Sequence, residues 1–80
     1  MPNEFYDPLV QTAGEIAEKY EISVADVLAL LLHAGRNEAL VRRVLAEGNK
    51  SEEARAARHS GRQFDLVAYA RPLLQRALGE

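Results

Sequence analysis

The chain contains no cysteine among its 80 residues. Without thiols it can form neither a disulfide bridge nor a thiolate zinc site, and this absence fits an intracellular setting. No apolar run reaches the roughly 18 residues that a membrane span needs, and the N-terminal residues MPNEFYD have no signal-peptide architecture. We therefore expect a cytoplasmic protein that has no membrane partner.

The sequence also lacks internal repeats and the alternating apolar pattern that is typical of strands. Eighty residues are close to the size at which one core gives only a few kcal/mol of stability. We predict an all-α fold: a single domain over residues 1–80, built as a small bundle of four to five short helices around a central apolar helix at residues 23–35. Residues 1–6 are expected to form a loose arm, and residues 48–62 a polar connection that can be mobile.

The central segment has clear start and stop signals. Ser23 and Asp26 form a capping-box pattern at its beginning, and Gly35 can take the left-handed conformation that ends many helices. The expected buried face follows the i, i+3, i+4, i+7 spacing and contains Val24, Val27, Leu28 and Leu31. The remaining sides are apolar as well, with Ala25, Ala29, Leu30 and Leu32.

A helix that is apolar on every side has to be surrounded, and a chain of this length offers little to surround it with. We therefore predict a homodimer. The residues expected at the dimer interface are Val24, Leu28, Leu31 and Leu32.

Two further helices flank this segment. The first is expected to start at Asp7-Pro8, with Asp7 as its cap, and to end at about Tyr20. Its inward face is predicted to contain Leu9, Ala13, Ile16, Ala17 and Tyr20. The next helix is expected to run from its cap Asn37 to about Glu47, with Gly48 as the terminator. Its apolar stripe is predicted to contain Leu40, Val41, Val44 and Leu45.

The last third of the chain predicts a short helix and a longer one. Ser51 is a good cap for a short helix, although the residues that follow offer nothing larger than alanine to bury. The final amphipathic segment runs from about Phe64-Asp65 to Leu78-Gly79. Pro72 interrupts it, so either the helix kinks there or it stops near Ala70 and a new helix begins.

Charge is distributed unevenly along the chain, although the net charge is only -2. Up to Leu32 there are six acidic residues and one lysine, whereas nine basic and six acidic residues follow. This asymmetry indicates two surfaces with different roles, or two parts that neutralise each other across the fold or a dimer.

The basic residues of the second part are candidates for contacts with nucleic-acid phosphates. The candidate set is Arg42, Arg43, Lys50, Arg55, Arg58 and Arg62. In a helix, Arg55, Arg58 and Arg62 would share one side at i, i+3 and i+7, which suits a row of phosphates. Two acidic residues, Glu52 and Glu53, dilute this charge, and no aromatic residue stands among the arginines for base stacking. A solvated polar helix is the alternative.

Residues 16–27, IAEKYEISVADV, resemble the helix-turn-helix of small bacterial and phage DNA-binding regulators, and the paired helices of ribbon-helix-helix repressors. The matching features are a small residue, Ala17, where the helices would cross, and Val27 as the inward residue of the second helix. The resemblance implies DNA binding and transcription regulation. The chain departs from the pattern at Glu21, where the turn usually has glycine, and in the apolar outward side of the second helix. Two core helices joined by a tight turn are the alternative.

Nothing in the sequence predicts catalysis or a cofactor. His33 and His59 have no spaced partners for a metal site, and no glycine-rich phosphate loop is present. We therefore expect no enzyme, no metal and no cofactor. Two functions stay open: a homodimeric DNA-associated regulator that contacts the phosphate backbone through its arginines, and a helical protein-interaction module, an adaptor or inhibitor, without a nucleic-acid role.

Overall fold

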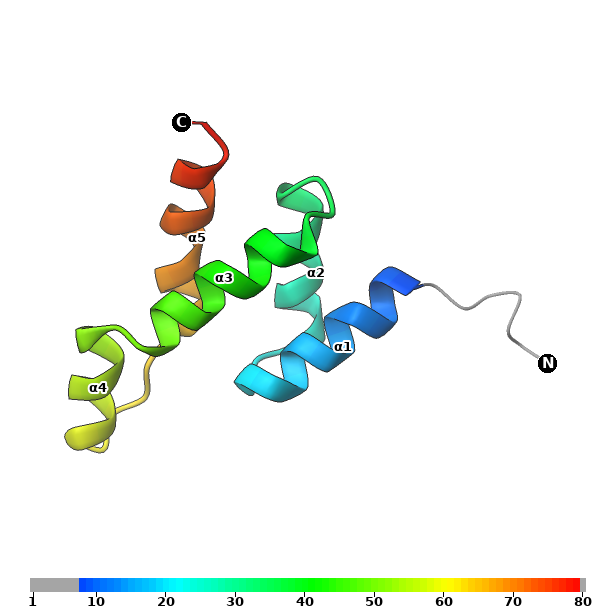
Figure 1. Ribbon diagram of the computed structural model, residues 1–80. Helices are drawn as coiled ribbons and strands as arrows, with labels where there is room; N and C mark the ends of the chain where they lie inside the picture. Colours follow the sequence, from blue (N-terminus) through cyan, green and yellow to red (C-terminus); the bar gives the residue numbers. More distant parts are fainter. Residues whose placement is uncertain (1–7, 80) are drawn as a thin grey trace.

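The computed structural model describes residues 8–79, which form five α-helices joined by short connections (Figure 1). The helices are α1 (Pro8–Tyr20), α2 (Val24–His33), α3 (Glu38–Asn49), α4 (Glu52–His59) and α5 (Leu66–Ala77). The described residues contain no strand, so the prediction of a small all-α bundle is confirmed. The expected arm over residues 1–6 and the expected cap Asp7 lie outside the described residues.

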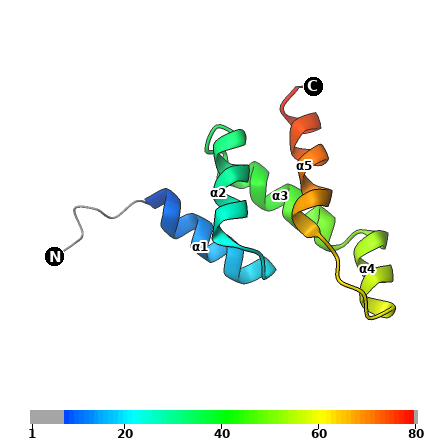
Figure 2. The same ribbon diagram turned by 180° about the vertical axis from the view of Figure 1, so that it is seen from behind.

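The helices lie in two layers. In Figure 1, α1 and α3 are nearer the viewer, and Figure 2 shows α2 and α5 from the opposite side. α3 packs along α5 and also contacts α1, α2 and α4, while α1 packs along α2. The body measures 47 × 31 × 15 Å, so it is a thin plate in which many helix faces stay at the surface. No helix of residues 8–79 is long and apolar enough to cross a bilayer.

The core lies between the two layers. Its largest fully buried side chains come from α1, α2, α3 and α5: Ile16, Val27, Leu30, Leu31, Val41, Val44, Leu45 and Leu74. The predicted inward residues of α1 and α3 are buried or half-buried, as expected. In α2 the buried residues are Val27, Leu30 and Leu31, and Ala34, just after the helix, continues this stripe, so the buried face is rotated from the predicted one. Periodicity could not identify the stripe, because apolar residues surround most of this helix.

Side-chain caps fix the starts of four helices. Ser23, Asn37, Ser51 and Asp65 each accept a hydrogen bond from the backbone N–H three residues further on, at 3.0 to 3.1 Å. Each cap satisfies a donor that the first helical turn would leave free. The caps expected at Ser23, Asn37 and Ser51 are therefore present.

The predicted end of α3 at Gly48 was wrong, because the helix continues to Asn49. Gly48 is buried against α5, and a Cβ atom at this position would lie 2.8 Å from Leu66 Cδ1 and 3.1 Å from Tyr69 Cδ1. The missing side chain thus allows α3 and α5 to approach closely. The polar connection starts two residues later than predicted and contains α4, whose Ala54 and Ala57 are buried.

α5 is one continuous helix that contains Pro72 in its interior. The alternative in which a helix stops near Ala70 and a new one begins is therefore wrong. Pro72 itself is exposed, and it cannot donate a hydrogen bond to the Ala68 carbonyl. Leu78, at the predicted end of this segment, follows the last residue of α5 and is 44% exposed.

Candidate functional surfaces

α2 carries an apolar surface on the side opposite its buried stripe. Four residues recur there at i, i+3, i+4 and i+7, a spacing that puts them on one side of a helix: Ala25, Leu28, Ala29 and Leu32. We call them the α2 stripe. Leu32 is 58% exposed, both alanines are exposed and Leu28 is half-buried. Figure 2 views α2 from the side that the α1–α3 layer leaves uncovered.

Of the four residues predicted at a dimer interface, three are at least partly exposed and one is buried in the core. Leu32 and Val24 are exposed, at 58% and 40%, and Leu28 is half-buried. Leu31 is fully buried within the single chain. Its placement at an interface is therefore corrected, because it packs in the core beside Val27 and offers no surface to a partner.

Polar side chains border the α2 stripe on the flank that faces α5. Asp26, in the first turn of α2, lines a hollow together with Asp65 and Leu66. His33, in the last turn, lines a second hollow of about 280 Å³ with Ala29 of the stripe and with Arg71 and Gln75 of α5. One flank of α2 therefore carries a carboxylate near its start and an imidazole at its end.

The connection between α1 and α2 consists of three residues, Glu21 to Ser23. Glu21 has a φ of +58°, the left-handed conformation that glycine adopts most easily. The backbone N–H of Ile22 donates to the Ala17 carbonyl at 3.0 Å, which closes the end of α1. The chain thus makes this tight turn with glutamate instead of glycine. The helix that would read bases nevertheless presents the apolar α2 stripe, which offers no hydrogen bonds to base edges.

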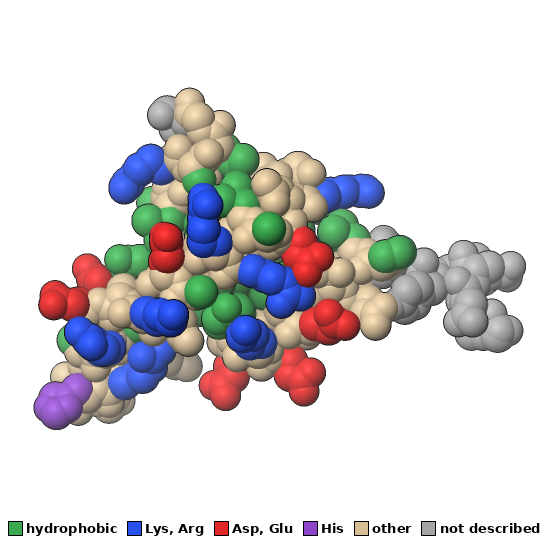
Figure 3. All heavy atoms as spheres, in the orientation of Figure 1, with side chains coloured by type: hydrophobic (Ala, Val, Ile, Leu, Met, Phe, Trp, Pro, Cys, Tyr) green, Lys and Arg blue, Asp and Glu red, His purple; other side chains and the backbone are tan. Residues whose placement is uncertain are grey.

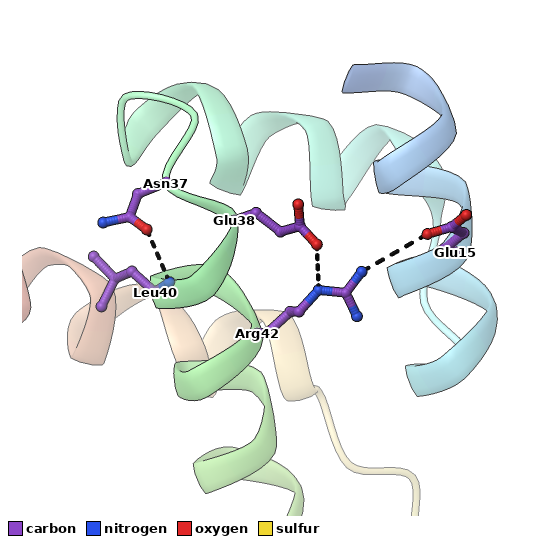
Figure 4. Close-up of polar contacts among 5 residues, drawn as sticks. All are labelled: Glu15, Asn37, Glu38, Leu40 and Arg42. Carbon is purple, nitrogen blue, oxygen red and sulfur yellow. Dashed lines mark hydrogen bonds and ion pairs between the residues drawn. The ribbon is translucent and has the colours of Figure 1, made fainter. Parts of the chain in front are cut away.

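Arg42 is held by carboxylates and is not a free cation. Its Nε lies 2.6 Å from Glu38 Oε2, and its guanidinium also approaches Glu15 of α1 at 3.8 Å (Figure 4). Arg42 therefore pairs with Glu38 one turn earlier in α3 and links α3 to α1. This double pairing argues against the phosphate contact that the sequence assigned to Arg42.

The other predicted cations lie on α4, its flanking residues and α3. We define the cationic cluster as Arg43, Lys50, Arg55, Arg58 and Arg62, all of which are exposed. Lys and Arg side chains gather over α4 and the adjacent end of α3 in Figure 3, with carboxylates at their edge. α4 is too short for the predicted row of three arginines. It ends at His59, and Gly61 turns the chain with a φ of +73°, so Arg62 does not continue the helical spacing.

Arg58 has a structural contact besides its place in the cationic cluster. Its guanidinium donates to the backbone carbonyl of Asn49 at 3.0 Å and to the side-chain oxygen of the same residue. These bonds tie α4 to the end of α3. Arg58 is therefore partly committed to holding α4, whereas the side chains of Arg43, Lys50, Arg55 and Arg62 make no hydrogen bond or ion pair with the described residues.

Two aromatic residues from different parts of the chain lie near Arg58 and Arg62. A hollow of about 280 Å³ is lined by Tyr20 at the end of α1 and Phe64 before α5, together with Arg58 and Arg62. Phe64 follows Arg62 by two residues, whereas Tyr20 is distant from the arginines along the chain, so nothing in the sequence indicated its position. Only the packing of the α1–α2 turn against the segment after α4 brings Tyr20 to this hollow.

The described residues contain no group of three or more metal-ligating side chains. Both histidines are exposed and lie at the ends of different helices, His33 on α2 and His59 on α4. Comparison with protein-family models, with characterised proteins and with solved structures finds no match to this chain. The functional argument therefore rests on the α2 stripe and the cationic cluster.

Proposed function

We propose that the protein is a small helical interaction module that works as a homodimer through the α2 stripe. The observation that carries this proposal is the outward position of four apolar residues on a helix whose opposite side is already buried. A contiguous exposed apolar face on a small domain is typical of a protein–protein interface. The same face lacks the polar side chains that a DNA-reading helix needs.

The expected association is weak, because one ten-residue helix presents a small surface. Full burial of a leucine contributes about 1.5 to 3 kcal/mol, and Leu32 is 58% exposed before association. Most of that gain is offset by the translational and rotational entropy that the two chains lose when they associate. We therefore expect a dimer that dissociates on dilution, with a dissociation constant on the order of micromolar.

Sedimentation equilibrium over a concentration series tests the proposal. The chain should approach twice its monomer mass at high concentration, and Leu32→Glu should keep it monomeric while the helical circular dichroism is unchanged. Leu78→Glu is the matched control, because Leu78 is similarly exposed but lies beyond α5. A monomer at every concentration, or equal effects of both substitutions, would contradict the proposal.

A second function is favoured by the cationic cluster, which supplies exposed positive charge in a chain of net charge -2. In this alternative the protein is a DNA-associated regulator that contacts phosphates, and Tyr20 and Phe64 lie close enough to Arg62 to join the contact. Glu52 and Glu53 in the first turn of α4 oppose it by repelling phosphates.

Fluorescence anisotropy with duplex and single-stranded DNA at about 50 mM salt tests this alternative, because low salt favours even non-specific phosphate contacts. Arg55→Gln combined with Arg62→Gln should weaken binding and flatten the salt dependence by about two units. Arg71→Gln combined with Arg76→Gln on α5 is the control of equal charge. Absence of binding by the unmodified protein would exclude the DNA function.

A further inference from the structure

We propose that a hollow between α2 and α5 binds a small organic carboxylate that carries a short apolar chain. The hollow has a volume of about 280 Å³ and is lined by Ala29, Leu30 and His33 of α2 and by Arg71 and Gln75 of α5. We call it the His33 hollow. The proposal does not depend on the homodimer, because one chain supplies every group that lines the hollow.

Three side chains with hydrogen-bond donors meet in the His33 hollow from two helices. His33 stands in the last turn of α2, while Arg71 and Gln75 stand one turn apart on α5. A guanidinium can bind both oxygens of a carboxylate, and an amide NH2 and an imidazole N–H can each donate a further hydrogen bond. None of the three side chains makes a hydrogen bond or ion pair with the described residues. Their donors are therefore available to a ligand.

The charges around the hollow favour an anion. No carboxylate lines it, and α5 contains two arginines and no acidic residue. The one acidic residue of α2, Asp26, is seven residues from His33, or about 10 Å along the helix axis. Free carbonyls at the end of α2 would oppose an anion. The carbonyls of residues 30–32, however, already accept hydrogen bonds from the backbone N–H groups of residues 34–36. The charge of Arg71 therefore dominates the hollow.

The apolar part of the wall determines the rest of the ligand. Ala29 and Leu30 line the hollow beside the donors, and Ala29 also belongs to the α2 stripe. An apolar chain on the carboxylate can therefore lie against Ala29 and extend along the α2 stripe, whereas a free phosphate would leave this wall without a contact. The volume is just below the range of about 300 to 1,000 Å³ that is typical of ligand pockets, so the ligand has to be small. Because Arg71 is exposed and water screens its charge, we expect a dissociation constant on the order of millimolar.

A titration followed by heteronuclear NMR at constant ionic strength tests the proposal with four probes: hexanoate, butyrate, hexanamide and inorganic phosphate. Hexanoate should shift the signals of residues 29–33 and 71–75 and reach saturation. Butyrate should bind several-fold more weakly, because each fully buried methylene contributes about a fourfold gain in affinity. Hexanamide has the chain without the charge, and phosphate has charge without the chain. Both should bind at least about tenfold more weakly than hexanoate.

Substitutions on both helices locate the site. Arg71→Gln should weaken hexanoate binding at least about tenfold, and His33→Ala, on the opposite helix, about two- to tenfold. Both residues are exposed, so the helical circular dichroism should be unchanged. Arg76→Gln is the matched control, because Arg76 is exposed on the same helix and carries the same charge but does not line the hollow.

Four results would each overturn the proposal. Shifts that do not saturate would show the absence of a site, and equal weakening by Arg71→Gln and Arg76→Gln would show that hexanoate responds only to the general charge of α5. Binding of hexanamide as tight as that of hexanoate would exclude a carboxylate site. Binding of phosphate as tight as that of hexanoate would exclude a role for the apolar wall.

Discussion

The two helical glycines of the described chain provide a sharp test of the packing between α3 and α5. Gly14 lies inside α1 and a Cβ atom there would meet nothing within 4 Å, whereas at Gly48 it would lie 2.8 Å from Leu66 and 3.1 Å from Tyr69. The same substitution, glycine to alanine, is therefore expected to have opposite effects at the two positions.

The magnitudes follow from helix propensity and from overpacking. Gly14→Ala should raise the free energy of unfolding by about 1 kcal/mol, because alanine favours the helix by that amount. At Gly48 the propensity gain is at most as large, and it is opposed by an overpacking cost of about 1 to 3 kcal/mol. Leu66 is buried and the Tyr69 ring packs against Phe64 at 5.7 Å, so neither can move freely. We expect Gly48→Ala to lower the stability by about 1 to 2 kcal/mol.

Thermal and urea unfolding followed by circular dichroism measure both effects. For a domain of this size, 1 kcal/mol corresponds to a shift of about 4 to 8 °C in the midpoint. Both variants should be compared with the unmodified chain at one protein concentration, because self-association adds stability. If Gly48→Ala stabilises the protein as much as Gly14→Ala does, the close contact of α3 with α5 is refuted.

Three other substitutions test single features of the fold. Glu21→Gly should raise the unfolding free energy by about 0.5 to 1 kcal/mol, because Glu21 has a φ of +58°; no gain in urea unfolding would argue against this conformation. Pro72→Ala should leave the helical content intact and stabilise the chain by about 1 to 3 kcal/mol, because α5 runs through Pro72. A loss of helical circular dichroism would contradict a continuous α5. Leu31→Glu should unfold the chain, because Leu31 is fully buried, whereas Leu32→Glu should leave it folded. Equal circular dichroism spectra of the two variants would refute the assignment of the buried and exposed faces of α2.

Local signals in the sequence were sufficient to locate the helices. Ser23, Asn37 and Ser51 accept the hydrogen bonds expected of helix caps. Gly35 has positive φ just after the end of α2, as its place in the sequence predicted, and Gly61 has positive φ just after α4. These features depend on residues within one turn of each other, so the sequence alone determines them.

Features that depend on distant residues were decided only by the tertiary structure. Gly48 had the sequence context of a helix terminator, yet Leu66 and Tyr69 pack against it, and α3 continues. Arg42 was a candidate for phosphate contacts in the sequence, yet Glu15 comes from another helix to join Glu38 in pairing with it.

The candidate surfaces show the same division. Composition showed that α2 is apolar on every side, which led to the prediction of a homodimer. Composition could not show that Leu31 is buried and Leu32 is exposed. The two leucines are equally hydrophobic, and only the helices that pack on α2 decide which of them is covered. Likewise, Tyr20 reaches the hollow of Arg58 and Arg62 only through chain folding. The sequence determined the helices and their caps, whereas the packing of α1, α3 and α5 around α2 decided which of its faces is left for a partner.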